Sequence, residues 1–161
     1  IFRFARIIGQ KYPDFEFHFY GDSHITNEVK KLSDSFENVK YFGPFKNPDD
    51  LSSIYNRINV VVACYDIQDL NERICEPNKL YESLFFIKPI IVSKNTFLAD
   101  RVSQFGCGFA IDASNDQSII SFLNSFSIEM AEKIINHLRE IKLSEMIDDN
   151  SNNIISYLKT L

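Results

Sequence analysis

The residue types best suited to chemistry lie in one short run, Glu76–Glu82, with the sequence EPNKLYE. Pro77 favours the first position of a helix, because its ring presets the helical backbone and it lacks only an amide that would be unpaired there. The free amides that follow, from Asn78 onward, and the positive end of the helix dipole form a place for a phosphate, to which Lys79 adds a mobile charge. Glu82 follows on the same helix face, where it can accept hydrogen bonds from a ribose diol or pair with Lys79 at the surface. The run therefore predicts a nucleotide-binding site.

The elements on either side of this run would position it. Residues 59–65 form an unbroken apolar, β-branched run, which is typical of a central strand of a parallel sheet that is buried on both faces. The polar stretch 66–76 has no periodicity and is interpreted as a loop between the carboxyl end of that strand and a helix over 77–86. In open parallel sheets, ligands bind at this edge.

Three polar side chains near this edge are candidates for a contact with a sugar or a phosphate. Tyr65 ends the strand, Ser93 ends the next strand along the chain, and Arg73 is a cation in the loop between them. For Arg73 the alternative is a salt bridge to Glu72 or Glu76 of the same loop.

Hydrophobic periodicity and turn signals divide the rest of the chain into alternating strands and helices. Strands are expected at 15–20, 39–42, 59–65, 90–92 and 109–112. Helices are expected at 1–12, 27–36, 48–58, 77–86, 96–105, 115–126, 128–143 and 144–161, with Asn47 and Ser127 as caps. Strand candidates separated by helices predict one doubly wound α/β sandwich over residues 1–161.

Composition is that of an ordinary globular protein. The 161 residues suffice for about one domain with a buried core. The formal net charge of −5 provides no basic surface for a nucleic acid, although local amides and one lysine can still bind a nucleotide. Cys64, Cys75 and Cys107 lack the spacing of metal ligands and are interpreted as free thiols in a reducing compartment. No apolar run approaches the roughly 20 residues of a membrane-spanning helix.

The sequence contains neither a recognisable catalytic triad nor a metal-binding motif. His18 lies within an alternating strand and is expected to be structural, while His24 and His137 are expected at the surface. None of them has a partner for a Ser/His/Asp or Cys/His arrangement. The acidic pairs 49–50 and 148–149 lie at predicted helix ends, where the helix dipole explains them. No residue is therefore assigned a catalytic role, and no metal is expected.

A series of short motifs runs through most of the chain. In order they are 17–21 (FHFYG), 39–45 (VKYFGPF), 51–55 (LSSIY), 59–64 (NVVVAC), 77–82 (PNKLYE), 88–93 (KPIIVS) and 106–109 (GCGF). Each motif alone is weak, but the ordered series resembles the C-terminal, donor-binding domain of GT-B-type glycosyltransferases of the group 1 (family four) class.

The resemblance implies one half of a GT-B fold. This half is a Rossmann-like three-layer sandwich with a parallel sheet of about five to six strands, facing an N-terminal acceptor domain across a cleft. It implies that Glu82 binds the ribose hydroxyls of a nucleoside-diphosphate sugar. The helix start at Pro77 and Asn78 would lie near the diphosphate, together with Lys79.

The resemblance also assigns positions near the first two strands. The turn that contains Gly43 and Phe45 resembles the loop whose backbone contacts the edge of the base. Gly21 resembles the glycine after the first strand, where a side chain would crowd the ligand. These residues complete the nucleotide-sugar site that the family pattern predicts.

Three departures from the family pattern affect the expected ligand contacts. Family members commonly carry a second glutamate eight positions before the one that matches Glu82, and here that position holds Ile74. The glycine-rich approach to the helix is replaced by 71–75 (NERIC). The arginine and lysine that grip the diphosphate in the family precede the opening helix, and thus would precede Ile1.

The reaction implied by the resemblance is transfer of a sugar from a nucleoside diphosphate to an acceptor hydroxyl, with retention of configuration. This is the chemistry of hexosyltransferases in polysaccharide or glycolipid synthesis, without a metal cofactor. The chain is then expected to be a fragment of a longer cytoplasmic enzyme, inactive alone, with peripheral association at the inner membrane face only through the missing part. The alternatives are a non-catalytic nucleotide-binding or interaction module and a sugar-nucleotide epimerase-like domain.

Overall fold

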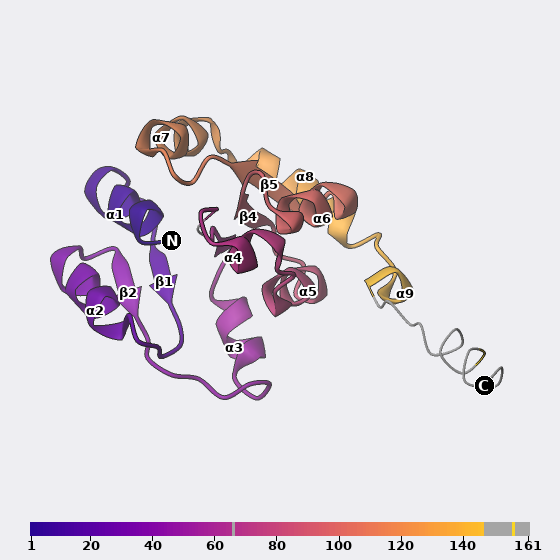
Figure 1. Ribbon diagram of the computed structural model, residues 1–161, viewed down its shortest axis with the longest axis horizontal. Coiled ribbons are helices and arrows are strands. Elements are labelled where there is room, and N and C mark those ends of the chain that lie inside the picture. Colours follow the sequence, from indigo (N-terminus) through magenta and orange to yellow (C-terminus); the bar gives the residue numbers. More distant parts are fainter. Residues whose placement is uncertain (66, 147–155, 157–161) are drawn as a thin grey trace.

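Two parallel β-sheets form the centre of the fold in the computed structural model, which describes residues 1–65, 67–146 and 156 (Figure 1). The first sheet pairs β1 (Phe17–Phe19) with β2 (Val39–Tyr41). The second has the order β3-β4-β5, with β3 (Val61–Ala63), β4 (Ile90–Ser93) and β5 (Gly108–Ile111). Every pairing is parallel, so the α/β class predicted from the sequence is confirmed.

The division into two sheets differs from the single sheet that the sequence predicts. Each strand lies at or next to its expected segment, yet in the described part of the chain β1 and β3 form no hydrogen-bonded pair. Apolar runs determine where strands form, whereas pairing requires two edges to meet, and no local pattern encodes that. The expectation of one sheet of about five to six strands is therefore wrong for the described residues.

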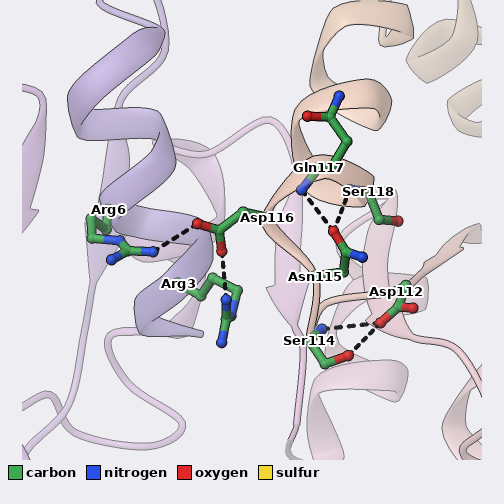
Figure 2. Close-up of polar contacts among 8 residues, drawn as sticks. All are labelled: Arg3, Arg6, Asp112, Ser114, Asn115, Asp116, Gln117 and Ser118. Carbon is green, nitrogen blue, oxygen red and sulfur yellow. Dashed lines mark hydrogen bonds and ion pairs between the residues drawn. The ribbon is translucent and has the colours of Figure 1, made fainter.

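Helices connect the strands and follow the last one. Their bounds are α1 (Phe2–Lys11), α2 (Thr26–Ser35), α3 (Leu51–Asn56), α4 (Leu70–Ile74), α5 (Asn78–Phe85), α6 (Phe97–Phe105), α7 (Asp116–Ser125), α8 (Ile128–Leu138) and α9 (Leu143–Met146). The side chains of Thr96, Asn115 and Ser127 cap α6, α7 and α8 by accepting hydrogen bonds from first-turn amides. Figure 2 shows Asn115 with the amides of Gln117 and Ser118. The predicted Ser127 cap is confirmed.

The start of α3 differs from its prediction. The helix begins at Leu51 rather than at Pro48, and Asn47 does not cap it. Instead, Asp50 Oδ2 accepts a hydrogen bond from the amide of Lys46 at 2.8 Å. This bond turns the chain just before the helix. Asp50 is the N-cap of α3, and the acidic pair 49–50 therefore lies at a helix end, as expected.

The predicted loop 66–76 contains the short helix α4. Asp69 caps it by accepting hydrogen bonds from the amides of Asn71 (2.8 Å) and Glu72 (3.3 Å). An acceptor residue followed three positions later by a glutamate is a helix-start signal, and the pair of Asp69 and Glu72 fits it. The loop prediction is therefore wrong for 70–74, although the sequence held the sign of a helix.

The last predicted helices are described only in part. α8 ends at Leu138 instead of extending to 143, and of the expected helix 144–161 only α9 and residue 156 are described. The acidic pair 148–149 lies outside the described residues. Within the described ranges, no helix combines the length and the apolar character needed to cross a membrane.

One buried apolar cluster extends across both sheets. It contains Phe17 and Phe19 of β1, Val39 of β2, Ile91 of β4 and Ile111 of β5, together with Cys64 and residues of α1, α2 and α7. A second cluster lies against the other face of β4 and includes Ile90. Because β4 is buried on both faces, it has the apolar composition of a central parallel strand.

The two sheets are also joined at the surface by two ion pairs between α1 and α7 (Figure 2). Arg3 Nη1 lies 2.5 Å from Asp116 Oδ1, and Arg6 Nη2 lies 3.0 Å from Asp116 Oδ2. The hydrogen bond from Arg3 is the main cause that lowers the pKa of Asp116 below its ordinary value. A lowered carboxyl pKa stabilises the folded state above the ordinary carboxyl range, and this contribution is lost as the pH falls through the lowered value.

We therefore expect Asp116→Asn to lose less stability in acid than the parent protein. Urea unfolding at about pH 7 and about pH 3 measures the difference. The effect is small because all three side chains are largely exposed and screened. Asp34→Asn, at an exposed position on α2, is the control and keeps the parent's pH dependence. An Asp116→Asn profile that matches the parent would contradict the prediction.

Candidate functional site

Helix α5 begins at the site that the sequence singles out. Pro77 has an extended backbone (φ −77°, ψ 152°) and is the N-cap, and Asn78 is the first helical residue. The helix thus starts one residue later than predicted. Leu80 and Leu84 are fully buried and anchor α5 in the core. Because Asn78 and Lys79 are exposed, the helix start remains open to a ligand.

Glu82 is held in place by two neighbours. Its Oε2 accepts a hydrogen bond from the Tyr55 hydroxyl at 2.6 Å and lies 3.7 Å from Lys79 Nζ. The Glu82 side chain is only 14% exposed, so it is fixed in the wall of the domain. Lys79 and Glu82 thus lie on one helix face, as predicted, and they form the pair that the sequence offered as the alternative to a ribose contact. Within the described part of the chain both contacts fall on Oε2, which leaves Oε1 able to accept further hydrogen bonds.

Tyr55 is a site residue that sequence reasoning missed. It comes from α3, is 4% exposed, and its ring stacks on Phe86 with centroids 4.5 Å apart. Burial, followed by the hydrogen bond to Glu82, raises the pKa of Tyr55 well above its ordinary value. The hydroxyl therefore stays protonated and donates to the carboxylate. No helical or strand spacing relates positions 55 and 82, so the sequence offered no signal for this contact.

A cavity of about 560 Å³ opens beside Glu82. One wall comes from residues within 47–52, and the other comes from α5 and the residue that follows it: Asn78, Tyr81, Phe85 and Phe86. Phe85 is 65% exposed, and such a large apolar ring at a cavity mouth provides a flat surface for another ring. The cavity thus combines a carboxylate acceptor, an amide side chain and aromatic faces. These groups match the hydroxyls and the planar ring of a nucleoside.

The predicted residues near β1 and β2 lie together, but they are not among the residues that line this cavity. The amide of Gly21 donates to the carbonyl of Gly43 at 2.8 Å, and both glycines have positive φ, +117° and +79°. That backbone conformation favours glycine without any ligand. Phe45 is partly buried and packs against the cluster that contains Tyr55 and Leu80.

Tyr65 and Ser93 line a separate cavity of about 360 Å³ at the carboxyl ends of β3, β4 and β5. The Ser93 hydroxyl donates to the Tyr65 carbonyl at 2.7 Å, and burial raises the pKa of the Tyr65 side chain. Lys94 and Asp112 also line this cavity, and Lys94 Nζ lies 3.1 Å from Asp112 Oδ2. Of the predicted site residues, Asn78 and Glu82 thus line one cavity and Tyr65 and Ser93 line the other, whereas the remaining ones line neither.

Arg73 lies on α4 and is exposed. In the described part of the chain Arg73 forms neither of its alternative salt bridges, to Glu72 or to Glu76, and Glu76 Oε1 instead pairs with Arg101 Nε at 2.6 Å. The Tyr81 hydroxyl also donates to Glu76, at 2.9 Å. The hydrogen bond to Glu76 is the main cause that raises the pKa of Arg101. Arg101 is thus a second contact that the sequence did not predict, and it ties α6 to the approach to α5.

None of the described histidines or cysteines lines the cavity beside Glu82. His18 pairs with Glu16 at 2.9 Å on β1, as a structural residue, and His24 and His137 are exposed, all as predicted. Residues 1–65 and 67–146 contain no group of side chains arranged to hold a metal ion. Cys64 and Cys107 are buried, and burial raises the pKa of their thiols to about 11 and about 12.

Comparison with models of known protein families found no match, and neither did comparison with curated proteins. The family assigned from the sequence motifs therefore stays a prediction. The function must be argued from the geometry of the site.

Removal of the Tyr55 hydroxyl should destabilise the domain while leaving its fold intact. Tyr55→Phe keeps the stacked ring but removes the hydrogen bond that the Tyr55 hydroxyl donates to the mostly buried Glu82 carboxylate. Because hydrogen bonds to charged groups are worth about 1.5–3 kcal/mol, we expect the free energy of unfolding to fall by about 2 kcal/mol in urea titrations. Tyr41→Phe, on β2, is the control and should change stability little. Equal stability of Tyr55→Phe and the parent would show that the bond does not hold Glu82.

Proposed function

We propose that this domain binds a nucleoside-diphosphate sugar and is the donor-binding part of a glycosyltransferase. The observation that carries the proposal is the fixed Glu82 carboxylate, set between the start of α5 and an aromatic cavity. A nucleoside diphosphate has a phosphate group, a ribose diol and a flat base in that same order.

The diol is assigned to Glu82. Tyr55 holds one carboxylate oxygen, so the other can accept the two ribose hydroxyls. Hydrogen bonds to an ionised acceptor are about twice as strong as those between neutral groups, which makes this contact the main source of affinity for the sugar of the nucleoside.

The phosphates are assigned to the start of α5. In the described part of the chain, the amides of Asn78 and Lys79 have no carbonyl partner at the positive end of the helix dipole, whereas the amide of Leu80 donates to the Pro77 carbonyl at 3.0 Å. Lys79 is about half exposed and only 3.7 Å from Glu82, so its ammonium group can turn toward a phosphate beside the ribose. The base then lies against Tyr81 and Phe85.

The proposed reaction is transfer of the sugar to an acceptor hydroxyl. Negative charge develops on the β-phosphate as the bond to the sugar breaks, and amides and cations already aimed at that oxygen stabilise the charge without reorganising. The described residues provide the donor site only. The acceptor site and any base belong to the N-terminal domain that the resemblance implies.

Titration calorimetry with UDP and GDP tests the proposal. We expect one of them to bind without added metal, and the matching 2′,3′-dideoxynucleoside diphosphate to bind about 10- to 100-fold more weakly, because it lacks the hydroxyls that Glu82 accepts. No heat from either nucleotide, or equal affinity for the dideoxy compound, would refute the assignment.

A non-catalytic nucleotide-binding module is the second candidate. It is favoured by Ile74, which stands where the family carries a sugar-binding glutamate and is 59% exposed on α4. Both candidates bind nucleotide, but only the glycosyltransferase releases sugar from its donor. Donor hydrolysis by the intact protein, followed by chromatography, distinguishes them.

A further inference from the structure

Tyr81 lines the cavity beside Glu82 while its hydroxyl is bound to another residue. The hydroxyl donates to Glu76 Oε1 at 2.9 Å. Glu76 lies just before the helix start at Pro77, in the short segment between α4 and α5. The Tyr81 ring is half-buried and packs against the apolar cluster that contains Leu80. The side chain is therefore held both at its ring and at its hydroxyl.

Glu76 is held in turn by Arg101, which comes from α6. Arg101 Nε pairs with the same oxygen, Glu76 Oε1, at 2.6 Å. The two side chains are only 22% and 29% exposed, so water and salt screen this pair less than a fully exposed one. Hydrogen bonds between charged groups are also shorter and stronger than neutral ones. The pair thus gives the Tyr81 hydroxyl an acceptor that is fixed in place.

Arg101 is itself restrained by its own helix. Its Nη1 donates to Gln104 Oε1 at 2.5 Å, and its guanidinium group lies 4.8 Å from the centroid of the Phe105 ring. Helix α6 is anchored in the core by residues that include Leu98 and Val102. A chain of contacts therefore runs from a fixed helix through Arg101 and the carboxylate to a residue of the cavity wall.

Packing of α5 on the sheet does not require this chain of contacts. Leu80 and Leu84 are fully buried and already anchor the helix. An isolated ion pair near the surface contributes little to stability. The contacts end instead on Tyr81, which faces the cavity. The network is therefore better explained by the site than by the stability of the fold.

We propose that Glu76 and Arg101 are positioning residues, which hold the Tyr81 ring in the cavity wall so that the base of a bound nucleotide can pack on it. This inference rests on the proposed function, which assigns the base to Tyr81 and Phe85. Arg101 touches no ligand and acts only through Glu76 and the Tyr81 hydroxyl. Without Arg101 the ring is free to turn away from the cavity, and binding must first bring it back.

Titration of variants with two ligands tests the proposal. Chemical-shift changes in NMR spectra follow the binding of UDP or GDP, whichever binds the parent more tightly, and of ribose 5-phosphate, which has the diol and a phosphate but no base. We expect Arg101→Gln to weaken the nucleotide by about 3- to 10-fold, since one more side chain must be ordered on binding. Ribose 5-phosphate should bind as it does to the parent.

Arg139→Gln is the matched control. It removes the same charge from an exposed position at the end of α8, and it should leave the affinity for both ligands unchanged. If Arg101→Gln does not fold, Glu76→Ala takes its place, because the bonds of Arg101 and of the Tyr81 hydroxyl both end on Glu76.

The route through the hydroxyl is tested with Tyr81→Phe, which keeps the ring and removes the bond to Glu76. We expect a loss of nucleotide affinity of the same size as for Arg101→Gln. In the Tyr81→Phe background, Arg101→Gln should then cause no further loss, because both substitutions interrupt the same chain of contacts. A role of Arg101 in packing alone would make the two losses add.

Three results would overturn the positioning role and leave the proposed function in place. They are unchanged nucleotide affinity of Arg101→Gln, equal weakening of the nucleotide and ribose 5-phosphate, and additive losses in the double variant. If ribose 5-phosphate binds too weakly to titrate, the additivity of the two substitutions decides alone. A parent chain that binds neither UDP nor GDP would instead refute the proposed function and this inference together, so the parent's own titration separates the two failures.

Discussion

Glu82→Gln should lower the affinity for a nucleoside diphosphate by about 10- to 100-fold, because two hydrogen bonds from ribose hydroxyls lose their charged acceptor. The substitution keeps the size of the side chain, and the amide oxygen of glutamine can still accept the hydrogen bond of Tyr55. The fold should therefore remain. Isothermal titration with the nucleotide that binds the parent protein measures the loss.

The control for this change is Glu132→Gln, which removes the same charge from an exposed position on α8. It should bind the nucleotide as the parent does. Equal affinity of Glu82→Gln and the parent would show that the Glu82 carboxylate does not contact the nucleotide, even if a nucleotide does bind. Weak binding by both variants would instead show a general effect of net charge.

The largest expected effect on stability comes from Gly108→Ala. A Cβ atom at this position would lie 1.9 Å from the carbonyl oxygen of Ile90, in the backbone of β4. The strands β4 and β5 pair through these residues, so relief of the clash must separate them. We expect the free energy of unfolding to fall by about 3 kcal/mol or more, as measured by urea titration followed by circular dichroism.

Gly43→Ala is the matched control, since an added Cβ there meets no atom within 4 Å. Its cost should be only the about 1–2 kcal/mol of a left-handed residue, because the φ of Gly43 is +79°. If both variants lose the same amount, the cost comes from glycine's backbone freedom and not from the close approach of two strands.

Local patterns in the sequence predicted the elements well. Apolar β-branched runs placed β3 and β4, and the predicted Ser127 cap marks a real helix start, whereas the predicted Asn47 cap does not. These signals act over a few residues and depend on backbone propensity and periodicity, which the sequence contains directly. Helix α4 was not predicted, although Asp69 provides the cap that signals its start.

The candidate site was predictable only along one helix. The three-residue spacing from Lys79 to Glu82 brings both side chains to one face, and the structure pairs them. Tyr55, in contrast, reaches Glu82 from α3, and Arg101 reaches Glu76 from α6. Contacts of this kind depend on how helices pack on the sheet, so a sequence pattern does not encode them. The division into two sheets was missed for the same reason.

The bond between Tyr55 and Glu82 has a consequence for the speed of ligand capture. Because the carboxylate is immobilised before any ligand arrives, its rotamer entropy is lost during folding and not during association. Encounter with a diol then requires no slow rearrangement of this side chain. Association should accordingly be limited by diffusion and by the approach of Lys79, and affinity should be set by the rate of release.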